Sequence, residues 1–560
     1  MDNYQIADNF SLLSKLMDIH GENSFKSKSY ATAAFTIEKL PVQLSETPPE
    51  KIAAIKGIGN SSAQKIIEIL ETGQLKVLEE IILTTPPGVV EMLNIKGIGP
   101  KKINTIWKEM ELETVGELLY ACKENRLKLY KGFGEKTQQN VIDTIEFYFK
   151  SKGSFLYAQV EPVAPLIQEI LQQLFPTKRL ELSGEFKRQL AVINELAFVL
   201  QEDIALIEKA IQHSEAFELE QRNEKDLLFK TSAGVKVRIY AADEKNFTAQ
   251  LLQTSSSAEF FEALVKSNPS LVEHSFPTEQ EYFEASGFPM IAPCLRETAR
   301  VLDVATTAGW PSIIQPADIK GIIHCHSNWS DGSNTIEEMA RAAIELGLEY
   351  LVISDHSKSA FYAQGLHEDK IMAQHQYIDE LNAKLFPFKI FKSIESDILN
   401  DGSLDYSPAV LSGFDLVIAS VHSNLKMTEE KAMARILTAI ENPYTTILGH
   451  MTGRLLLSRP GYPVDHEKII DACAANNVVI ELNAHPNRLD IDWRHISGAL
   501  EKNVLISIDP DSHAASALSD TRYGVLVAQK AMLTKEQNLS SFSLQQFQEY
   551  INQRKVMKGI

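Results

Sequence analysis

The chain has 560 residues, of which 44% are hydrophobic and 23% charged. This length exceeds what one hydrophobic core supports, so about three or four domains are expected, and the composition excludes a mainly disordered, collagen-like or coiled-coil protein. Four widely separated cysteines without a C-x-x-C pair argue against a disulfide framework or a Cys-based zinc site. Because no apolar run suits a bilayer and the first residues do not resemble a signal peptide, we expect a cytoplasmic monomer without membrane contact.

The net charge of −19 comes from 74 acidic and 55 basic side chains. Taken alone, it argues against a nucleic-acid partner, because neutralising phosphates requires clustered Lys and Arg. Residues 1–150, however, carry 18 basic and 20 acidic side chains, so the acidity lies mainly in the rest of the chain. The amino-terminal part therefore remains suited to phosphate contacts.

Residues 1–150 are predicted to form short helices separated by Gly-containing turns. The next part mixes helices with strand-like runs at Leu196–Leu200 and Val235–Tyr240, and a further helical segment with a linker is expected before residue 315. Beyond it, short β-like runs alternate with helices, which predicts an α/β barrel with its chemistry at the carboxyl ends of the strands. These runs are Gly321–His324, Leu351–Ser354, Leu416–Ala419, Thr446–Leu448, Val478–Leu482 and Leu505–Ile508. We expect four domains, at residues 1–150, 151–245, 246–314 and 315–560.

An apolar-x-Gly-apolar-Gly pattern occurs three times in the amino-terminal part: IKGIG twice and YKGFG once. Glycines at this spacing permit a tight turn and leave backbone N–H groups free at the start of the next helix, where a phosphate can bind. Lysines flank the first two copies, and no acid lies between Lys96 and Lys108. The pattern resembles the helix-hairpin-helix motif, which grips the DNA backbone without reading sequence. The predicted DNA contacts are Lys56, Gly57, Gly59, Gly97, Gly99, Lys101, Lys102, Gly132 and Gly134; the third copy could also be structural only.

Eleven of the fourteen histidines lie at or beyond position 324, and several follow predicted strands. His324 and His326 lie on one side of a strand end because side chains alternate with a period of two. Imidazoles and carboxylates without thiolates suit Zn²⁺, Mn²⁺ or Fe²⁺ rather than a closed structural zinc site. The nine candidate ligands are His324, His326, Asp331, His356, Glu395, His422, His450, Asp511 and His513.

These residues lie in the segments HCH, SDG, SDH, SIESD, SVH, GHMTGR and DSH, which resemble the PHP (polymerase and histidinol phosphatase) domain. The resemblance implies a distorted (β/α)7 barrel with three divalent metals, Mn²⁺ first and Zn²⁺ or Fe²⁺ as alternatives. It assigns His324, His326, Glu395 and Asp511 to one metal. Glu395 would bridge to a second held by His422 and His450, and Asp331, His356 and His513 would hold the third. Glu395, His326 and Asp511 are the expected catalytic residues, and hydrolysis of a phosphomonoester or phosphodiester is the expected reaction. Lys358, Arg454, Asn483 and Arg488 could bind substrate phosphate or support the site.

The whole chain resembles bacterial family X DNA polymerase. The opening GENSFKSKSYATAAFTIEKL and the segment FPMIAPCLRE match that family's amino-terminal and thumb segments. The resemblance implies a nucleotidyltransferase-like α+β palm and thumb, but it fails at the polymerase site. The three metal-binding aspartate positions hold Glu195, Ala197 and Lys236, and Glu185 stands where the family has a Ser. Since two Mg²⁺ ions need converging oxygen ligands, we expect no nucleotidyl transfer. A neighbouring acid such as Asp203 or Asp243 is the alternative ligand.

Lys65 follows the first Gly turn in the sequence Ala63-Gln64-Lys65-Ile66. Eukaryotic members of the family have a Schiff-base lysine at this place, so Lys65 is a candidate lyase nucleophile. The alternative is a lysine that steers phosphate or keeps the surface soluble.

We expect a DNA-end-processing phosphoesterase that acts at gapped or nicked ends. The resemblance implies Mn²⁺-dependent 3′→5′ exonuclease activity, with 3′-phosphatase or AP-endonuclease activity as further options, in DNA repair. A small-molecule phosphatase of the histidinol-phosphatase type, a non-catalytic DNA-binding scaffold and a residual DNA polymerase are the alternatives. The Gly turns argue against the first alternative, and the nine retained ligand positions argue against the second.

Overall fold

The computed structural model describes residues 3–40, 42–95, 97–150, 153–212, 214–232, 234–267, 269, 274–306 and 310–560. It divides into two compact units, residues 1–148 and residues 149–560. Lys96, which we counted among the lysines near the second Gly turn, lies outside the described residues. Among the described helices, none is both long enough and apolar enough to cross a membrane.

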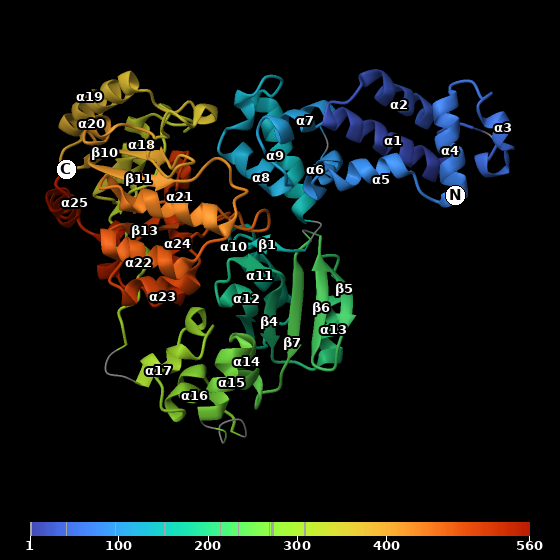
Figure 1. The fold of residues 1–560 in the computed structure, drawn as a ribbon. Helices are drawn as coiled ribbons and strands as arrows, with labels where there is room; N and C mark the ends of the chain where they lie inside the picture. Colours follow the sequence, from blue (N-terminus) through green and yellow to red (C-terminus); the bar gives the residue numbers. More distant parts are fainter. Residues whose placement is uncertain are drawn as a thin grey trace. The chain divides into compact units, whose positions relative to one another are not determined.

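The first unit is helical, as the sequence predicts (Figure 1). Helix α1 buries Ile6, Phe10, Leu13 and Met17, an i, i+3/i+4 spacing that places one apolar face against α2. The helices are α1 (Asn3–His20), α2 (Ser24–Glu38), α3 (Pro49–Ile52), α4 (Asn60–Thr72), α5 (Lys76–Leu83), α6 (Pro87–Glu91), α7 (Pro100–Lys108), α8 (Val115–Lys123) and α9 (Glu135–Lys150).

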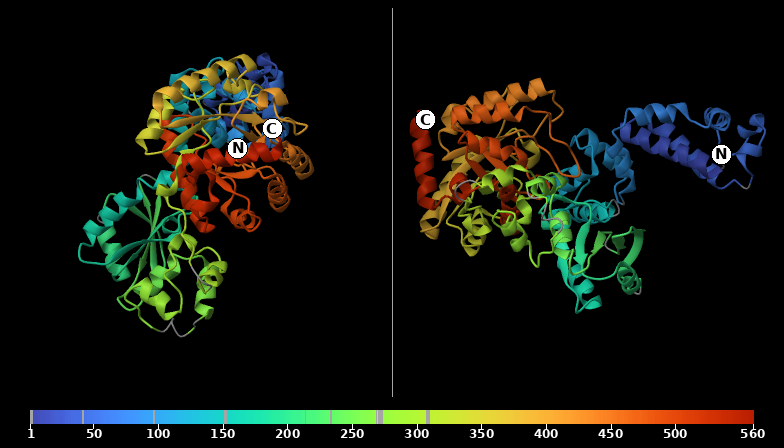
Figure 2. Two further views of the ribbon diagram at one scale, coloured as in Figure 1. Left: turned by 90° about the vertical axis from the view of Figure 1, so that its left-hand side faces the viewer. Right: turned by 90° about the horizontal axis from the view of Figure 1, so that it is seen from below.

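The second unit begins with a five-stranded sheet in the order β2-β4-β7-β6-β5, which corresponds to the expected palm. Only the central pair, β4 and β7, is parallel. Figure 2 shows this sheet with helices packed beside it. Its strands are β2 (Leu180–Ser183), β4 (Leu196–Leu200), β5 (Phe217–Arg222), β6 (Asp226–Thr231) and β7 (Lys236–Ala241), with β1 (Phe155–Leu156) and β3 (Val192–Ile193) paired separately. Its helices are α10 (Tyr157–Val160), α11 (Ala164–Leu174), α12 (Gly184–Lys187) and α13 (Ile204–Ile211).

Four further helices lead to the last domain and correspond to the expected thumb and linker. Their core contains Phe260, Phe283 and Ile291, all fully buried. The helices are α14 (Phe247–Thr254), α15 (Ala258–Ser267), α16 (Glu279–Ala285) and α17 (Arg300–Thr306).

Seven parallel strands in the order β14-β13-β12-β11-β10-β9-β8 form a nearly closed barrel. The first and last strands meet beyond their ends, where the Cys325 segment bridges Ser512 and the His326 N–H donates to the Ser512 carbonyl at 2.8 Å. The strands are mostly apolar and buried on both faces, as expected for parallel strands covered by helices. They are β8 (Gly321–Ile322), β9 (Tyr350–Ile353), β10 (Lys389–Asp397), β11 (Leu416–Ser420), β12 (Thr445–Leu448), β13 (Val479–Asn483) and β14 (Ile506–Asp509).

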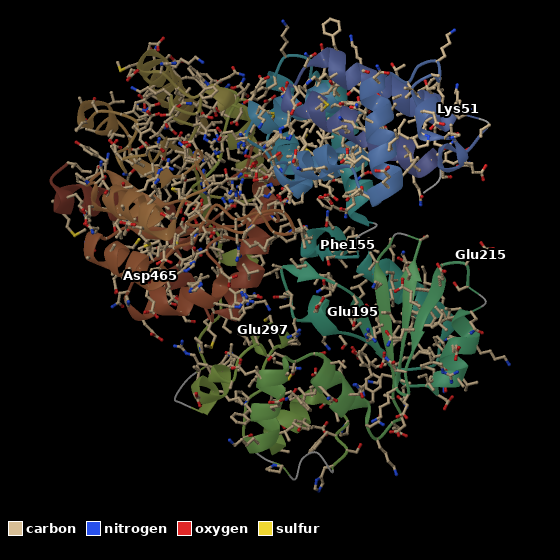
Figure 3. The ribbon with its side chains drawn as sticks, turned by 45° about the vertical axis from the view of Figure 1, so that its right-hand side comes forward. Lys51, Phe155, Glu195, Glu215, Glu297 and Asp465 are labelled. Carbon is tan, nitrogen blue, oxygen red and sulfur yellow. The ribbon has the colours of Figure 1, made fainter. Side chains whose placement is uncertain are left out.

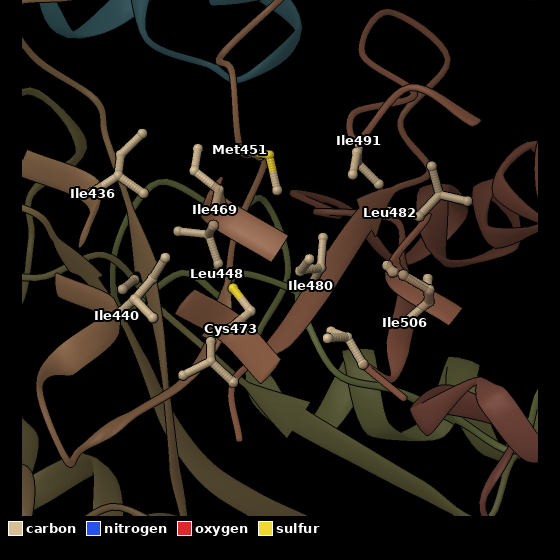
Figure 4. Close-up of a cluster of buried hydrophobic side chains, with 14 of the residues drawn as sticks. Ile436, Ile440, Leu448, Met451, Ile469, Cys473, Ile480, Leu482, Ile491 and Ile506 are labelled. Atoms are coloured by element: carbon tan, nitrogen blue, oxygen red, sulfur yellow. The ribbon is translucent and has the colours of Figure 1, made fainter. Parts of the chain in front are cut away.

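Helices surround these strands (Figure 1) and supply the other half of the core. Leu448, Ile480 and Ile506 from the strands pack with Ile436 and Ile469 from the helices (Figure 4). The helices are α18 (Ile336–Glu345), α19 (Glu368–Leu385), α20 (Pro408–Leu411), α21 (Glu429–Glu441), α22 (His466–Asn476), α23 (Trp493–Glu501), α24 (Thr521–Lys530) and α25 (Leu544–Lys558). The barrel therefore has the predicted fold class and presents the carboxyl ends of its strands at one end.

Palm and barrel contact each other through α24. Lys530 is buried and donates to the backbone carbonyl of Arg188, while its Nζ lies 3.3 Å from Glu297 Oε1. Glu297, labelled in Figure 3, also pairs with the Arg188 guanidinium at 3.0 Å. Nearby, Glu161 of the palm accepts hydrogen bonds from both Arg522 and Tyr523.

Candidate functional site

The nine predicted ligands converge at the carboxyl ends of the barrel strands, although they are far apart in the sequence. Six of the seven strands carry ligands near or beyond their carboxyl ends, so parallel neighbours bring these side chains to one place. They are His324 and His326 after β8, Asp331 in the loop that follows, His356 after β9, Glu395 in β10, His422 after β11, His450 after β12, and Asp511 and His513 after β14.

Glu395 lies at the centre of the cluster and is fully buried. Its two oxygens face different sets of imidazoles, so one carboxylate contacts both sides of the site. The surrounding nitrogens are His422 Nε2 and His450 Nε2, each 3.1 Å from Oε1, His324 Nε2 at 3.4 Å from Oε1, His356 Nδ1 at 2.9 Å from Oε2, and His326 Nε2 at 3.6 Å from Oε2.

His326 connects the remaining ligands. Its ring stacks against those of His356 and His513, with centroid distances of 4.3 and 4.2 Å. Asp331 faces the same two rings, 3.6 Å from His356 Nε2 and 3.5 Å from His513 Nε2. On the other side, the Asp511 carboxylate lies 3.0 Å from His326 Nε2.

Three groups of ligand atoms each lie within 4.8 Å of one another. They are His324, His326 and Asp511; His356, Glu395 and His422; and His326, Asp331, His356 and His513. The expected assignment used each imidazole once, whereas the geometry places His326 and His356 within reach of two groups each. His450, outside these three groups, still reaches Glu395. All nine residues therefore form one continuous cluster.

The carboxylates and imidazoles of the cluster shift each other's pKa values. Burial alone would raise the pKa of Glu395, but His422, His324 and His356 outweigh it and hold that pKa well below its ordinary value. Burial lowers the pKa of His326 to about 3, and the adjacent His513 and His356 add to the effect. Glu395 is therefore ionised and His326 neutral, the protonation states in which both bind metal. Although burial opposes it, neighbouring carboxylates raise the pKa values of His324, His356 and His422, so metal binding would release protons from these three imidazoles.

Carboxylates and an amide behind the ligands fix their orientation, and sequence reasoning missed the most important ones. Glu481 in β13 accepts a hydrogen bond from His324 Nδ1 at 2.5 Å and another from the His450 backbone N–H at 2.5 Å. Asp397 accepts a hydrogen bond from His422 Nδ1, and Asn483 donates to Asp511 at 3.0 Å. Such partners set which imidazole nitrogen faces the site. No spacing in the sequence distinguishes these acids from other polar residues in strands.

The residues fit divalent metals. Among the described residues, none forms a geometrically acceptable hydrogen bond with His324 Nε2 or Asp331 Oδ2, although both atoms are buried. Buried polar atoms are normally satisfied, so two such atoms in one ligand cluster point to bound cations. Nitrogen and oxygen ligands without thiolates suit Mn²⁺, Fe²⁺ or Zn²⁺.

All four residues named as possible phosphate-binding or supporting neighbours have partners within the barrel. The Arg454 guanidinium donates to the carbonyls of Arg488 and Leu489 and to Asp492, so it is committed to the loop around it. Asn483 holds Asp511, as described above, and Arg488 Nε lies 3.7 Å from Asp511 Oδ2. Lys358 is more exposed and pairs with Glu368 at 2.7 Å.

In the palm, a positively charged arginine side chain lies beside the positions at which a polymerase would need metal ligands. The Arg238 guanidinium donates to both oxygens of Glu195, at 2.6 and 2.9 Å, and also pairs with Asp226. Glu195 is labelled in Figure 3. Arg238 stands beside Ala197 in the parallel β4–β7 register. Lys236, which we expected at the third ligand position, lies two residues earlier with its Nζ 3.7 Å from Glu220. Sequence reasoning missed Arg238 because its effect depends on this register.

The three Gly turns share one conformation. Gly57, Gly97 and Gly132 have φ angles of 97°, 95° and 92°, a region that favours glycine. The apolar residue between the glycines is buried in each copy. A Cβ built on the second glycine, Gly59, Gly99 or Gly134, would have no described atom within 4 Å. The backbone at the start of α4, α7 and α9 is therefore open to a phosphate, and Lys101 and Lys102 lie in the first turn of α7.

Lys65 lies in α4 and is half-buried. Its Nζ stands 5.8 Å from the centroid of the Tyr30 ring in α2.

Comparisons with known proteins match both parts of the chain. Three family models match: a helix-hairpin-helix domain at residues 1–75, a SAM-like helix-hairpin-helix tandem at residues 89–146 and a PHP domain at residues 323–485. The chain is 30% identical over 554 residues to the DNA polymerase/3'-5' exonuclease PolX of Bacillus subtilis (strain 168), with 96% of each chain covered.

Shorter relatives share part of the chain. A probable phosphatase of Thermoanaerobacter sp. (strain X514) is 27% identical over 238 residues, which cover 40% of this chain and 89% of the relative. A probable phosphatase of Acetivibrio thermocellus is 31% identical over 156 residues, 27% of this chain and 59% of the relative.

Proposed function

The chain belongs to the bacterial PolX family, and we propose that it is a metal-dependent phosphoesterase that shortens DNA from 3′ ends. The observation that carries this proposal is the buried cluster of nine nitrogen and oxygen ligands around Glu395. Removal of 3′-phosphates and incision at abasic sites are additional reactions that the same site could perform. We place this activity in a cytoplasmic monomer that acts at gaps or nicks during DNA repair.

The chain's own residues have distinct tasks in this reaction. Glu395 and Asp511 supply negative charge to the cation site, and Glu481 and Asp397 hold His324 and His422 with their ring nitrogens aimed inward. Divalent cations bound there would activate water and neutralise the charge that develops on the phosphoryl oxygens. Because the ligands are buried and hydrogen-bonded from behind, they need little reorganisation when substrate arrives.

We propose that the palm has no nucleotidyl transfer activity. Ala197 supplies no oxygen ligand, and Arg238 already occupies both oxygens of Glu195. A divalent cation at this place would have to displace a paired guanidinium, whose positive charge repels it.

We propose that the Gly turns of the first unit grip the DNA backbone. Their open backbone, together with Lys56, Lys101 and Lys102, supports contacts to phosphate rather than to bases. The binding should be sequence-independent and weaken with salt. Lys65 stays a candidate lyase nucleophile, tested by borohydride trapping on a 5′-deoxyribose phosphate end with Lys65→Ala as the control.

The function is tested with end-labelled single-stranded and gapped DNA in the presence of Mn²⁺, Zn²⁺ or Fe²⁺. Wild-type protein should release mononucleotides from 3′ ends, and Glu395→Gln, which keeps the size but removes the charge, should lose at least about a hundredfold in rate. Glu345→Gln changes an exposed carboxylate of the same barrel and should retain full activity. Equal rates for wild type and Glu395→Gln would refute the site assignment.

A small-molecule phosphatase is the second candidate, because probable phosphatases are among the relatives. It predicts that histidinol phosphate or a similar monoester is hydrolysed with much higher kcat/KM than DNA ends. Our proposal predicts the opposite preference.

A further inference from the structure

We propose that Phe361, on the rim of the barrel, stacks against unpaired nucleobases of the DNA strand whose phosphate lies in the metal centre. This inference rests on the proposed function and names its substrate form, a single-stranded 3′ end. The Phe361 side chain is 80% exposed. It lies in the loop between β9 and α19, five residues after the ligand His356.

The base of this loop is part of the metal centre. The Ser357 N–H donates to the Glu395 carbonyl at 3.0 Å, and the Leu366 N–H donates to the His356 carbonyl at 2.9 Å. The loop therefore leaves from one ligand and returns to the same ligand. Five residues span at most about 18 Å, and a stacked strand advances about 3.4 Å per nucleotide. The Phe361 ring thus lies within a few nucleotides of the scissile phosphate.

The loop is held in one conformation. Ala360 and Ala363, on either side of the exposed ring, are completely buried. A Cβ at Gly365 would lie 1.9 Å from the Ser357 carbonyl oxygen, so the two sides of the loop touch. The backbone that carries the Phe361 ring is thereby closely packed.

The loop that follows β10 holds the Phe361 loop through Asp405 and Tyr406. The Tyr406 hydroxyl donates to the Leu366 carbonyl and accepts a hydrogen bond from the Lys358 N–H at 3.1 Å, and Asp405 accepts one from the Ser359 N–H at 2.6 Å. A loop with these anchors presents its aromatic ring in a fixed position, which reduces the entropy cost of binding.

Nucleobases are the partners that fit this ring. Single exposed apolar residues are common on protein surfaces and need no explanation by themselves. Phe361 differs because its rigid loop begins at a metal ligand, and the proposed substrate carries a flat base on each side of the bond to be cleaved. Stacking of bases on aromatic rings is a major source of affinity for single-stranded DNA and does not depend on sequence.

The test compares the full-length chain with Phe361→Ala, Phe361→Trp and Phe386→Ala. Phe386 is the matched control, because it is 85% exposed and lies at the opposite end of the barrel, close to the start of β10. Phe361→Ala should raise KM for a single-stranded oligonucleotide about tenfold with kcat unchanged, and Phe361→Trp should restore the wild-type value. Phe386→Ala should behave as wild type. Hydrolysis of bis(p-nitrophenyl) phosphate, a diester without nucleobases, should be equal in all four proteins.

An oligonucleotide with abasic residues at its 3′ end provides the decisive comparison. For wild type, KM should rise on this strand by the same factor by which the Phe361→Ala substitution raises KM on normal DNA. For Phe361→Ala, KM should be the same on both strands. The inference would be overturned if Phe361→Ala had the wild-type KM on normal DNA. It would also be overturned if the abasic strand raised KM equally for wild type and for Phe361→Ala. If no protein hydrolyses either substrate, the proposed function fails. The inference is then decided by anisotropy with a short fluorescent oligothymidylate, and equal Kd values for wild type and Phe361→Ala would overturn it.

Discussion

Glu481 contacts two of the proposed metal ligands from behind. Its two oxygens hold the His324 ring and the His450 backbone, each at 2.5 Å. We predict that Glu481→Gln lowers the affinity for Mn²⁺ by about 10- to 100-fold, because the amide is a weaker acceptor for the imidazole N–H. Calorimetric titration measures this affinity, with the exposed Glu441→Gln as the control. Equal affinities in wild type and Glu481→Gln would show that the contact does not tune the site.

His375 in α19 makes the stability of the barrel depend on pH. Burial, reinforced by Lys392, lowers its pKa to about 4 in the fold, whereas a histidine in the unfolded chain titrates near 6.5. The stabilisation from neutral His375 is therefore complete above about pH 6.5 and is lost as the pH falls toward 4. His375→Phe keeps the ring beside Phe414 but cannot take up a proton.

Urea unfolding at several pH values checks this prediction. The free energy of unfolding should fall less between pH 6.5 and 4 in His375→Phe than in wild type. His367→Phe, at an exposed histidine, should keep the wild-type slope. Identical slopes for wild type and His375→Phe would contradict the assignment.

For single residues, the sequence reveals the candidate metal ligands better than the residues that hydrogen-bond to them from behind. His324, His356 and His422 each follow an apolar run, so their place at a strand end is visible in the sequence. Glu481 and Asp397 lie within or at the end of strands, and their roles appear only when the neighbouring strands bring His324 and His422 to them. The same holds for Arg238, whose contact with Glu195 is created by strand register.

The Gly turns provide a prediction at the scale of elements. Gly99 has a φ of −89° and open space around its Cβ position, so Gly99→Ala should fold normally while its methyl group blocks an approaching phosphate. We expect about a tenfold loss in duplex DNA affinity, equivalent to one charge-assisted hydrogen bond. Fluorescence anisotropy measures the affinity, and thermal unfolding checks the fold.

Gly97→Ala is the matched comparison. Gly97 has a φ of 95°, where an alanine is strained, so this variant should lose about 1 kcal/mol or more of stability. If Gly99→Ala binds DNA as tightly as wild type, the turns do not hold phosphate in the proposed way.

Strand β10 illustrates what the sequence does not reveal about elements. It is the longest strand of the barrel, Lys389–Asp397, and it carries Glu395, yet we did not predict it as a strand. Lysines, serines and acids interrupt its apolar residues. The acids lie at the end of the strand that reaches the ligand cluster, whereas Lys392 pairs with Asp379 of α19. By contrast, the apolar runs of β9, β11, β12, β13 and β14 made their approximate positions predictable.

At the scale of the whole second unit, Lys530 fastens the barrel to the palm. It donates to the Arg188 carbonyl, and its Nζ lies 3.4 Å from the Cys294 carbonyl and 3.3 Å from Glu297. Lys530→Ala would leave these buried acceptors unsatisfied and should cost about 2 kcal/mol. Denaturant unfolding should then show separate transitions for palm and barrel, while Lys535→Ala, at an exposed lysine, should unfold as wild type. An unchanged single transition in Lys530→Ala would show that other contacts join the two domains.

The most direct test of the account is the change in length of a labelled primer on gapped DNA with Mn²⁺ and all four deoxynucleoside triphosphates present. Under these conditions an active palm would lengthen the primer, whereas an active barrel would shorten it. We predict that the primer only becomes shorter, and that Glu395→Gln leaves it unchanged in length. Templated extension of the primer, or shortening that persists in Glu395→Gln, would contradict the account.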